Sequence, residues 1–350
     1  MVADCQLSIE CVDSLAGLQA LEPVWCALER ASQTPFPFLT HAWAMSWWKH
    51  LAKRKLHVRD SISVRVLRTP AGEVVAIAPL MCTERPPFGP LRTRQLQFLG
   101  RDDGDITELR GMLCLPEFEA DAYRALLAEL QRSAASWDWM LWHRLRKAST
   151  GERQVTACGG ECVAHVPNYV LPLAASWTDL HAGLPRNIKE SLRKCYNSLK
   201  RDGLTPTLQV VEEPSAIRSA LSHFFRLHGA RASMSSGKFH RNAFDTDAKR
   251  SFLSEVCERL AVQGKTRIFL LKLGERVVAT RIGFVINGSI YLYYSGYDPE
   301  FAKYSVMTTT VAEALKHAIS LGLRSANLSS GNDVSKTRWA PREDLYCEVV

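Results

Sequence analysis

Hydrophobic and polar positions change their spacing between Gly288 and Gly322, and this stretch gives the clearest prediction of local structure in the chain. Ser289–Tyr297 is rich in Ile, Leu and Tyr and is followed by Asp298-Pro299, which is typical of a buried strand that stops where proline cannot donate a hydrogen bond. From Val306 onward, apolar residues follow the helical spacing until Gly322. The sequence therefore predicts a strand, a turn and a helix.

The turn between this strand and this helix, residues 300–308, is a candidate ligand-binding segment. It lies at the carboxyl end of a strand and at the amino end of a helix, where backbone N–H groups have no intrahelical partner. These groups and the positive end of the helix dipole favour an anion. We therefore expect a phosphate-bearing ligand at this turn.

The first half of the chain has the pattern of an α/β unit. Amphipathic spacing predicts helices over residues 18–31, 40–51 and 117–133. Apolar runs predict strands over residues 62–67, 73–82, 91–99, 109–115 and 137–145. Thr69-Pro70-Ala71-Gly72 supplies the turn between the first two of these strands.

The second half again has the mixture of helical and strand patterns of an α/β unit. It begins after an irregular passage, residues 148–175, that contains several glycines and two prolines. We place the domain crossover there, which gives an N-terminal domain over residues 1–165 and a C-terminal domain over residues 166–350. Helices are expected over residues 177–200, 215–231, 243–263 and from 306, and strands over residues 208–211, 265–273, 276–286, 289–297, 324–328 and 346–350. Asn287-Gly288 between two apolar runs predicts a hairpin.

Composition narrows the class of protein. A chain of 350 residues exceeds a typical single core, and a hydrophobic content of 46% excludes a largely disordered chain. The apolar stretches are shorter than the roughly 20 residues of a membrane helix, and the first residues do not resemble a signal peptide. Ten cysteines without an export signal favour free thiols in a reducing compartment, so we expect a cytoplasmic protein.

A net charge of +8 suggests a polyanionic partner, and the basic residues concentrate in one predicted helix. Residues 186–201 carry six basic side chains and one acidic side chain. At about 100° per residue, one face holds Ile188, Leu192, Cys195 and Leu199, and an adjacent face holds Arg186, Lys189, Arg193 and Lys200. The basic face is either a solvated surface or a site that attracts a phosphate-bearing substrate.

Several motifs together resemble the GNAT acyltransferases of the CelD-like, Fem-related branch, which occur in bacterial polysaccharide and cell-envelope gene sets. The matching segments are LPRNIKESLRKCYNSLKRDG, FFRLHGAR, GERVVATRIGFVINGSIYLYYSGYDPEFAKYS and SGNDVSKTRWA in the second half, and LEPVWCALE and FLTHAWAMSWW in the first. The family usually has Pro-Gly where this chain has Val306-Met307, and an acid and an arginine where it has Asn327 and Ser330. Met307 must then direct its side chain away from a bound pyrophosphate.

The resemblance implies an α/β fold of tandem GNAT-like domains, each with a mixed, mostly antiparallel sheet flanked by helices. It implies an N- or O-acyltransferase that moves an acetyl or longer acyl group from acyl-CoA to an amine or hydroxyl of a sugar, polysaccharide precursor or other small metabolite. The residues expected to hold acyl-CoA are Ser295, Gly296, Lys303, Ser305, Val306, Met307 and Thr308. An ordinary helix start capped by Ser305 is the alternative for this loop.

Four further residues are candidates for catalysis: His228, Asp298, Tyr304 and Lys336. His228 normally titrates near neutrality and suits a general base, and Arg231 lies three residues later on the same helix face, where it can hold an anionic group. A structural histidine is the alternative. Tyr304 and Asp298 lie beyond a strand end, and the tyrosine could protonate a departing thiolate. The resemblance assigns charge stabilisation to Lys336.

Two other functions remain open. An aminoacyl-tRNA-dependent, Fem-type transferase would suit the basic helix, and a non-catalytic scaffold that keeps the fold would suit the changes at Met307, Asn327 and Ser330. No metal is expected, because the pair Cys158 and Cys162 has no second Cys or His pair at zinc spacing.

Overall fold

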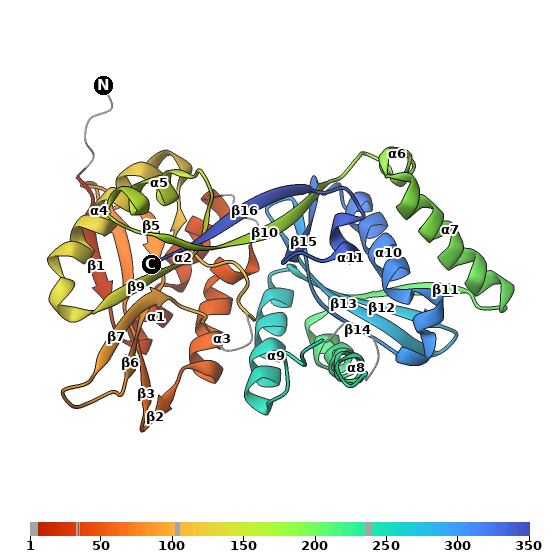
Figure 1. Cartoon of the computed structure of the whole chain (residues 1–350), viewed down its shortest axis with the longest axis horizontal. Coiled ribbons are helices and arrows are strands. Elements are labelled where there is room, and N and C mark those ends of the chain that lie inside the picture. The colour runs from red at the N-terminus through yellow and green to blue at the C-terminus, as the bar shows by residue number, and fades with distance from the viewer. Residues whose placement is uncertain (1–5, 33, 35, 102–105, 235–239) are drawn as a thin grey trace. The chain divides into compact units, whose positions relative to one another are not determined.

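The structure is a computed structural model that describes residues 6–32, 34, 36–101, 106–234 and 240–350 (Figure 1). Contacts divide the chain into two compact units. Unit 1 comprises Met1–Pro167 and Asp344–Val350, and unit 2 comprises Asn168–Glu343. The chain therefore leaves unit 1, forms unit 2 and returns to unit 1 with its last strand.

Unit 1 contains two sheets. The first has the strand order β1 (Ser8–Val12), β4 (Val64–Arg68), β5 (Val74–Ala78) and β8 (Leu113–Cys114). The second has the order β2 (Arg54–Lys55), β3 (Val58–Ile62), β6 (Leu80–Arg85), β7 (Thr93–Phe98), β9 (Trp139–Arg146) and β16 (Arg342–Val349). One long hairpin serves both sheets, because Ser63 separates β3 from β4 and Pro79 separates β5 from β6.

The helices of unit 1 are α1 (Leu15–Ala20), α2 (Glu22–Ala31), α3 (His41–Leu51), α4 (Glu119–Arg132) and α5 (Thr150–Ala157), with short 3-10 turns at η1 (Pro37–Leu39), η2 (Pro116–Phe118) and η3 (Ala134–Ser136). Leu126 and Leu130 of α4 pack with Phe98 and Trp142 in a hydrophobic core cluster of this unit. The amphipathic pattern of α4 thus explains why this helix covers the sheet.

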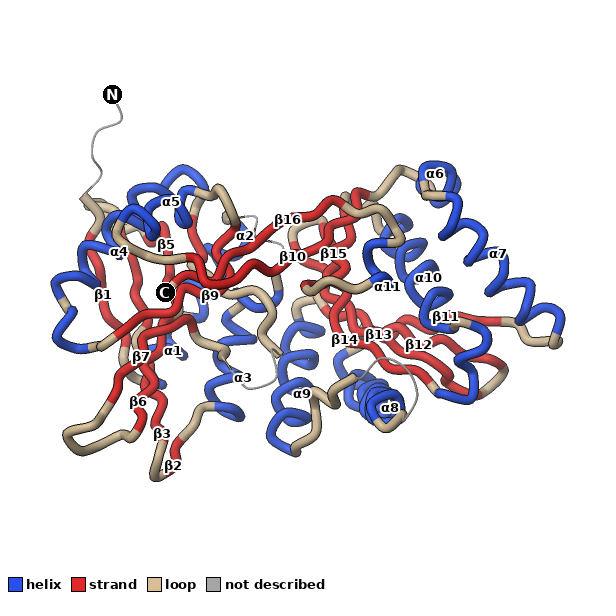
Figure 2. The backbone as a smooth tube through the Cα atoms, in the orientation of Figure 1, coloured by secondary structure: helices blue, strands red, loops and turns tan. Residues whose placement is uncertain are grey.

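Unit 2 contains sheet strands in the order β11 (Pro206–Val211), β12 (Thr266–Leu273), β13 (Arg276–Ile286), β14 (Ser289–Tyr297), β15 (Ser325–Ser330) and β10 (Cys162–Pro172), of which residues 168–172 belong to this unit and residues 162–167 to unit 1. Its helices are α6 (Trp177–Gly183), α7 (Arg186–Arg201), α8 (Pro214–Ala232), α9 (Asp247–Val262), α10 (Val306–Ser320), α11 (Val334–Thr337) and the 3-10 segment η4 (Pro299–Tyr304). Helices α8 and α9 cover one face of this sheet, and α10 with α7 covers the other (Figures 1 and 2).

Both units contain the same supersecondary arrangement. An antiparallel meander is followed by a helix and by a strand that pairs in parallel with the last meander strand: β7, α4 and β9 in unit 1, and β14, α10 and β15 in unit 2. The other strand pairs described in these sheets are antiparallel. The expected α/β fold with mixed, mostly antiparallel sheets flanked by helices is confirmed.

Several elements agree closely with the sequence prediction, and others differ. Strand β14 has the expected bounds, and α7 buries the expected face of Ile188, Leu192, Cys195 and Leu199. The predicted helix over residues 177–200 is instead two helices, because Leu184-Pro185 interrupts it. The irregular passage contains α5 and β10, which were not predicted.

The last strand also differs from the expectation. It was expected to close the sheet of the second half, but Asp344–Val350 belong to unit 1. Strand β16 lies between β10 and β9, with Tyr346 opposite Arg146 and Cys347 opposite Leu145. Cys347 and Val349 are almost fully buried in the core of unit 1, which explains the pairing. None of the helices in the described ranges combines the length and the hydropathy that crossing a bilayer requires.

Candidate functional site

Strands β14 and β15 of unit 2 separate after a short parallel contact. Their parallel ladder runs from Ser289 with Ser325 to Tyr291 with Asn327, although β14 continues to Tyr297. Two carbonyls of the continuing stretch accept hydrogen bonds from side chains: Leu292 from Arg281 Nη2 at 2.9 Å, and Ser295 from His228 Nδ1 at 2.9 Å. The far half of β14 is therefore an edge at which a ligand can bind the backbone.

A bulge bends β14 within this stretch. Gly283 of β13 pairs with Leu292, whereas Arg281 pairs with Ser295, so β14 contains one residue more than its partner between these pairs. A bulge redirects the backbone and the side chains that follow it. Ser295 and Tyr297 come next, and they lie two residues apart and so on one side of the strand.

Gly296 allows helix α8 to approach this part of β14. A Cβ atom at residue 296 would lie 2.4 Å from the backbone nitrogen of His228, a distance that packed atoms do not tolerate. The glycine therefore acts as a packing residue. It brings His228 and Arg231 of α8 to the bulge.

His228 bridges two backbone groups of opposite polarity. Nδ1 contacts the Ser295 carbonyl at 2.9 Å, and Nε2 accepts a hydrogen bond from the Ala243 N–H at 3.2 Å. Because the amide can only donate, Nε2 is the acceptor and Nδ1 carries the proton. Burial lowers the pKa of His228, and the ring stacks on Phe224 at 5.2 Å between centroids. This geometry describes a neutral imidazole that positions β14.

Arg231 lies in a polar cluster on the same side of the sheet. Its Nη1 donates to Ser295 Oγ at 3.3 Å and its Nη2 contacts His240 Nε2 at 2.8 Å, while the guanidinium carbon lies 5.5 Å from the centre of the Tyr297 ring. Burial lowers the pKa of Arg231, and the Coulomb attraction of Tyr297 and Asp333 opposes this effect. Sequence reasoning selected Arg231 but missed Tyr297, although the alternation of Ser295 and Tyr297 was a usable signal.

The junction of η4 and α10 is the turn at which the sequence predicts a phosphate-bearing ligand. Ser305 has φ 52° and ψ 43°, the left-handed conformation, and α10 begins at Val306. The Ser305 hydroxyl accepts no capping hydrogen bond from α10, so the helix start capped by Ser305 that the sequence offered is not observed. Met307 packs against an apolar cluster that includes Leu199, Leu271 and Tyr304, so its side chain points into the core. Ser305 itself is exposed at this turn, and its carbonyl accepts a hydrogen bond from the Thr308 N–H at 2.8 Å.

Lys303 and Tyr304 of this junction contact the end of α7. The Tyr304 hydroxyl donates to Asp202 Oδ2 at 2.7 Å, and Lys303 Nζ lies 3.7 Å from the same carboxylate oxygen. The Lys303 ammonium also lies 4.7 Å from the centre of the Tyr304 ring. The hydrogen bond from Tyr304 is the main cause that lowers the pKa of Asp202. Tyr304 is thus engaged away from the bulge in β14.

The side chains of Asp298 and Lys336 both stabilise loops through hydrogen bonds. Asp298 Oδ1 accepts from the Glu300 N–H at 3.2 Å, and its Oδ2 accepts from Arg276 Nη2 at 2.6 Å. Lys336 Nζ donates to the Ser330 carbonyl and, at 3.4 Å, to the Gly331 carbonyl. These contacts fix the entry into η4 and the loop between β15 and α11.

The cations of α7 lie on the α10 side of the sheet, opposite to His228 and Arg231. Lys189 and Arg193 line an open depression of about 390 Å³ between α6 and α7, together with Trp177 and Tyr196. Arg186 is paired with Glu190 at 2.6 Å, and Lys189 donates to the Ala182 carbonyl at 2.6 Å. The predicted residues therefore fall into two groups on opposite faces of one sheet.

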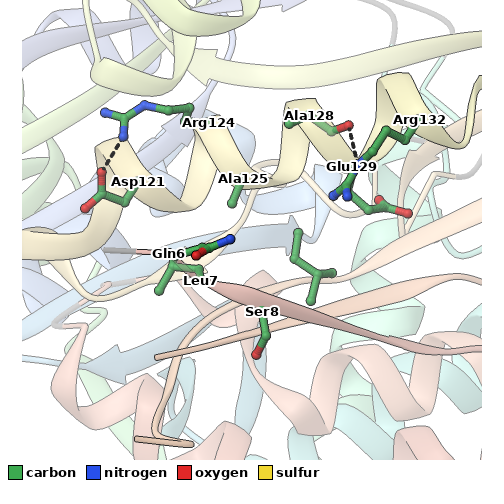
Figure 3. A pocket seen from close by; sticks show the side chains of 10 residues that line it. Gln6, Leu7, Ser8, Asp121, Arg124, Ala125, Ala128, Glu129 and Arg132 are labelled. Atoms are coloured by element: carbon green, nitrogen blue, oxygen red, sulfur yellow. Dashed lines mark hydrogen bonds and ion pairs between the residues drawn. The ribbon is translucent and has the colours of Figure 1, made fainter. Parts of the chain in front are cut away.

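Two of the open depressions among the described residues of unit 1 have volumes of about 640 Å³ each. One lies between β1 and α4, where the side chains of Leu7, Ala125 and Ala128 accompany the Asp121–Arg124 pair (Figure 3). The other is lined by the basic residues Arg110, Arg144, Arg146, Lys147 and Arg153. Neither contains the strand separation and helix start that distinguish unit 2.

Comparison with known proteins agrees with the geometry of unit 2. Residues 186–337 match the acetyltransferase (GNAT) domain family. This segment is a GNAT-superfamily domain. It includes α7, the meander, the separated pair β14 and β15, and α10, which are the elements described above. No curated protein matches the chain significantly.

The fold of the whole chain is Fem-related. The crystal structure of FemX superposes with a TM-score of 0.60 at 11% identity and covers 93% of this chain and 95% of FemX. The C-terminal domain of a putative lysylphosphatidylglycerol synthetase from Agrobacterium fabrum superposes with a TM-score of 0.57 at 11% identity and covers 96% of this chain and 92% of that domain. At this identity the likeness concerns the fold, which extends over both units.

Proposed function

We propose that the GNAT domain transfers an acetyl or longer acyl group from acyl-CoA to an amine or hydroxyl of a small acceptor, such as a sugar or polysaccharide precursor. The observation that carries the proposal is the separation of β14 from β15 after Tyr291, next to the start of α10. A strand edge can hydrogen-bond the amides of a pantetheine arm. A helix start suits the pyrophosphate.

The exposed cations of α7 support the same placement of the donor. Cys195 of α7 lies beside Ser305, whose hydroxyl contributes to the pKa of the Cys195 thiol, so α7 packs against the start of α10. Arg193 and Lys200 are exposed on this helix. Their charge would raise the local concentration of a phosphate-bearing donor.

In the proposed reaction, the acceptor nitrogen or oxygen attacks the thioester carbonyl, loses its proton, and the C–S bond breaks to release CoA thiolate, which takes up a proton. A backbone N–H group of β14 near Ser295 and Gly296 would stabilise the oxyanion, since the edge of β14 opposite to β13 has no ladder pair with β15 beyond Tyr291. His228 would position this edge rather than act as the base. Tyr297, beside Arg231, is better placed than Tyr304 to donate the proton.

A charge change at the start of α10 tests donor binding. Thr308→Asp places a carboxylate in the first turn, where the helix dipole favours it by about 0.3–1 kcal/mol but where it would repel a pyrophosphate. We expect the thermal stability to be unchanged or higher and the Kd for acetyl-CoA, measured by calorimetric titration, to rise at least about tenfold.

The isosteric Thr308→Val serves as the matched control and should keep the Kd within about twofold. A Thr308→Asp protein that binds acetyl-CoA as tightly as the parent would exclude the α10 start as the pyrophosphate site. A parent protein that gives neither binding heat nor thermal stabilisation with a panel of acyl-CoAs would reject the donor altogether.

A second candidate, transfer from aminoacyl-tRNA, is favoured by the exposed basic face of α7 and by the fold shared with FemX. Its signature is retention of tRNA that weakens steeply with salt, in a protein that acetyl-CoA does not stabilise. A protein that neither binds acetyl-CoA nor retains tRNA would instead support a scaffold that keeps the GNAT fold without a donor.

A further inference from the structure

A cluster of metal-ligating side chains lies in unit 1, outside the GNAT domain. In the described part of the chain, one group of three His, Cys, Asp or Glu residues has converging ligand atoms: Cys162, His165 and Cys347. All three residues belong to unit 1, and 182 positions separate His165 from Cys347. Only folding brings them together.

The ligand atoms of this group lie close enough together to converge on one ion. Cys347 Sγ lies 3.4 Å and Cys162 Sγ lies 3.7 Å from His165 Nδ1, and the ligand atoms are all within 4.8 Å of one another. Zn–S bonds of about 2.3 Å and Zn–N bonds of about 2.0–2.1 Å at tetrahedral angles separate S from N by about 3.5 Å. Cys162 Sγ also lies 3.9 Å from His165 Nε2, so it approaches the imidazole beside both ring nitrogens. Coordination through Nδ1 therefore requires a rotation of the exposed Cys162 side chain toward the lone pair of that atom.

The local backbone holds this arrangement. Glu161 and Val350 exchange two hydrogen bonds, of 2.9 and 3.0 Å, which join the chain before β10 to the end of β16. Gly160 permits the approach, because a Cβ atom there would lie 2.7 Å from Val349 Cγ1. Cys347 is 1% exposed, whereas Cys162 and His165 face solvent. One side of the group is therefore open to water.

We propose that Cys162, His165 and Cys347 form a Zn²⁺ site in unit 1, with water as the fourth ligand. Binding displaces the proton of each thiol to solvent, and two thiolates with a neutral imidazole balance the charge of the ion. The ion connects β10 to the C-terminal strand β16. The sequence pattern alone hides this site, because its visible pair was Cys158 with Cys162, and Cys158 lies outside the group.

The test uses the full-length, reduced protein after removal of metal with a chelator. Titration with Co²⁺, which reports tetrahedral thiolate ligation through its absorption, should saturate at about one ion per chain and give thiolate-to-metal charge-transfer bands. Zn²⁺ should then displace the Co²⁺. The melting temperature should rise by several degrees when free Zn²⁺ is about 100 times the Kd.

Three variants and one control locate the ligands. Cys162→Ser, His165→Gln and Cys347→Ala should each weaken Zn²⁺ binding by about 100-fold or more, because loss of mere supporting contacts costs 10–100-fold. Cys158→Ser, an exposed cysteine four residues from Cys162, should change the Kd less than about threefold. Cys162 and His165 are exposed, so their variants test the ligands even where Cys347→Ala fails to fold.

Two results would overturn the proposal. One is Co²⁺ binding without charge-transfer bands, or binding that Cys158→Ser weakens as much as Cys162→Ser does. The other is a disulfide between Cys162 and Cys347 in protein kept under reductant, which intact mass would show as a loss of two hydrogens and which would leave no thiolates for a metal.

Discussion

A histidine whose two ring nitrogens face backbone groups of opposite polarity is held in one protonation state. At His228, the Ala243 N–H requires a lone pair on Nε2 and the Ser295 carbonyl requires a proton on Nδ1. A general base must instead accept a proton through a free lone pair. The geometry of His228 therefore favours a positioning role, in which the imidazole holds the bulge of β14.

The pH dependence of stability provides the first test of this role. The folded-state pKa of His228 is lowered by burial, so below the unfolded value of about 6.5 the unfolded chain binds more protons than the folded chain. Stability from the neutral imidazole is thus present above about pH 6.5 and lost as pH falls. We expect His228→Gln, whose amide can both donate and accept, to weaken the fall in urea midpoint between about pH 7 and pH 5.

Activity measurements separate positioning from base catalysis. If His228 positions β14, His228→Gln should keep the acid limb of the kcat profile with pH and lose no more than about tenfold in kcat. A base assignment predicts that the acid limb disappears and that kcat falls by about 100-fold or more at every pH. Disappearance of the acid limb together with this fall in kcat would show that His228 is the general base.

The locations of the candidate residues were more predictable than their partners. The sequence placed Asp298 and Tyr304 in the loop after β14, which the structure confirms, because Pro299 and the strand pattern mark that position locally. The partner of Tyr304 is Asp202, 102 residues away, and no local pattern indicates which direction a phenol will take. Side-chain chemistry of this kind depends on the packing of distant segments.

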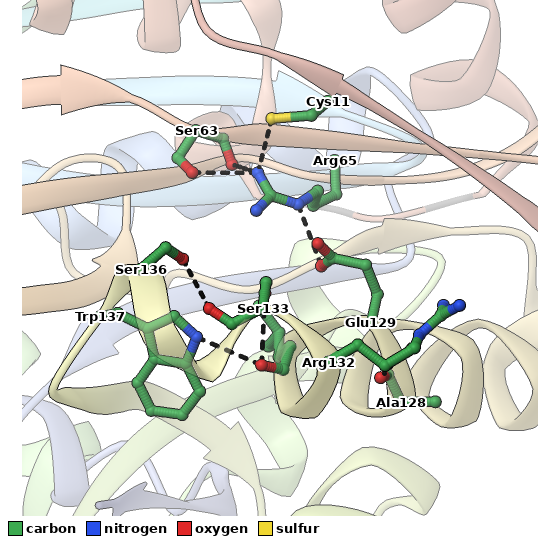
Figure 4. A network of polar contacts seen from close by, with 10 residues as sticks. Cys11, Ser63, Arg65, Ala128, Glu129, Arg132, Ser133, Ser136 and Trp137 are labelled. Carbon is green, nitrogen blue, oxygen red and sulfur yellow. Dashed lines mark hydrogen bonds and ion pairs between the residues drawn. The ribbon is translucent and has the colours of Figure 1, made fainter.

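At the scale of elements, a buried arginine joins two strands and a helix of unit 1 (Figure 4). Arg65 of β4 donates from Nε to Glu129 Oε2 of α4 at 3.1 Å, and from Nη1 to Cys11 Sγ of β1 and to the Ser63 carbonyl, each at 2.9 Å. The Arg65 side chain is 8% exposed and that of Glu129 is 21% exposed. The pair therefore fixes the orientation of α4 on its sheet.

Removing one partner of the Arg65–Glu129 pair should lower the free energy of unfolding. Glu129→Ala leaves a buried guanidinium without its counter-ion, and we expect a loss of roughly 3 kcal/mol in the free energy of unfolding, the lower end of the range for buried pairs. Asp121→Ala, which breaks an ion pair with Arg124 on the same helix, should cost less than about 1 kcal/mol. Urea denaturation measures both, and equal losses would contradict the structural role of Arg65.

Elements with strong periodicity were predictable, and elements that contain helix or strand breakers were not. The buried face of α7 follows from its spacing alone, because one apolar residue recurs at each turn. Strand β10 contains Pro167 and Pro172, which weaken every local strand signal, so its pairing with β15 is determined by tertiary packing. Helix α5 is short, and neighbouring glycines made its segment resemble a loop.

At the scale of the molecule, the order of the strands along the chain differs from their order in the sheets. The same arrangement of meander, helix and parallel strand occurs in both units, so the sequence could predict two similar halves. It could not predict that the final strand returns to unit 1, because β16 directly follows the GNAT domain in sequence. The partner of an apolar strand is set by the exposed sheet edge that it completes, here that of β9.

Removal of the last strand tests this return of the chain. A protein that ends at Glu343 lacks Asp344–Val350, including the buried residues Cys347 and Val349. Although the deleted residues follow the GNAT domain, we expect faster amide hydrogen exchange in β9 and α5 of unit 1 and unchanged protection in β12 and β13 of unit 2. Each backbone hydrogen bond of β9 that loses its partner becomes exposed to exchange, whereas the unit 2 meander keeps its own ladder. Loss of protection confined to unit 2 would show that β16 stabilises the GNAT domain instead.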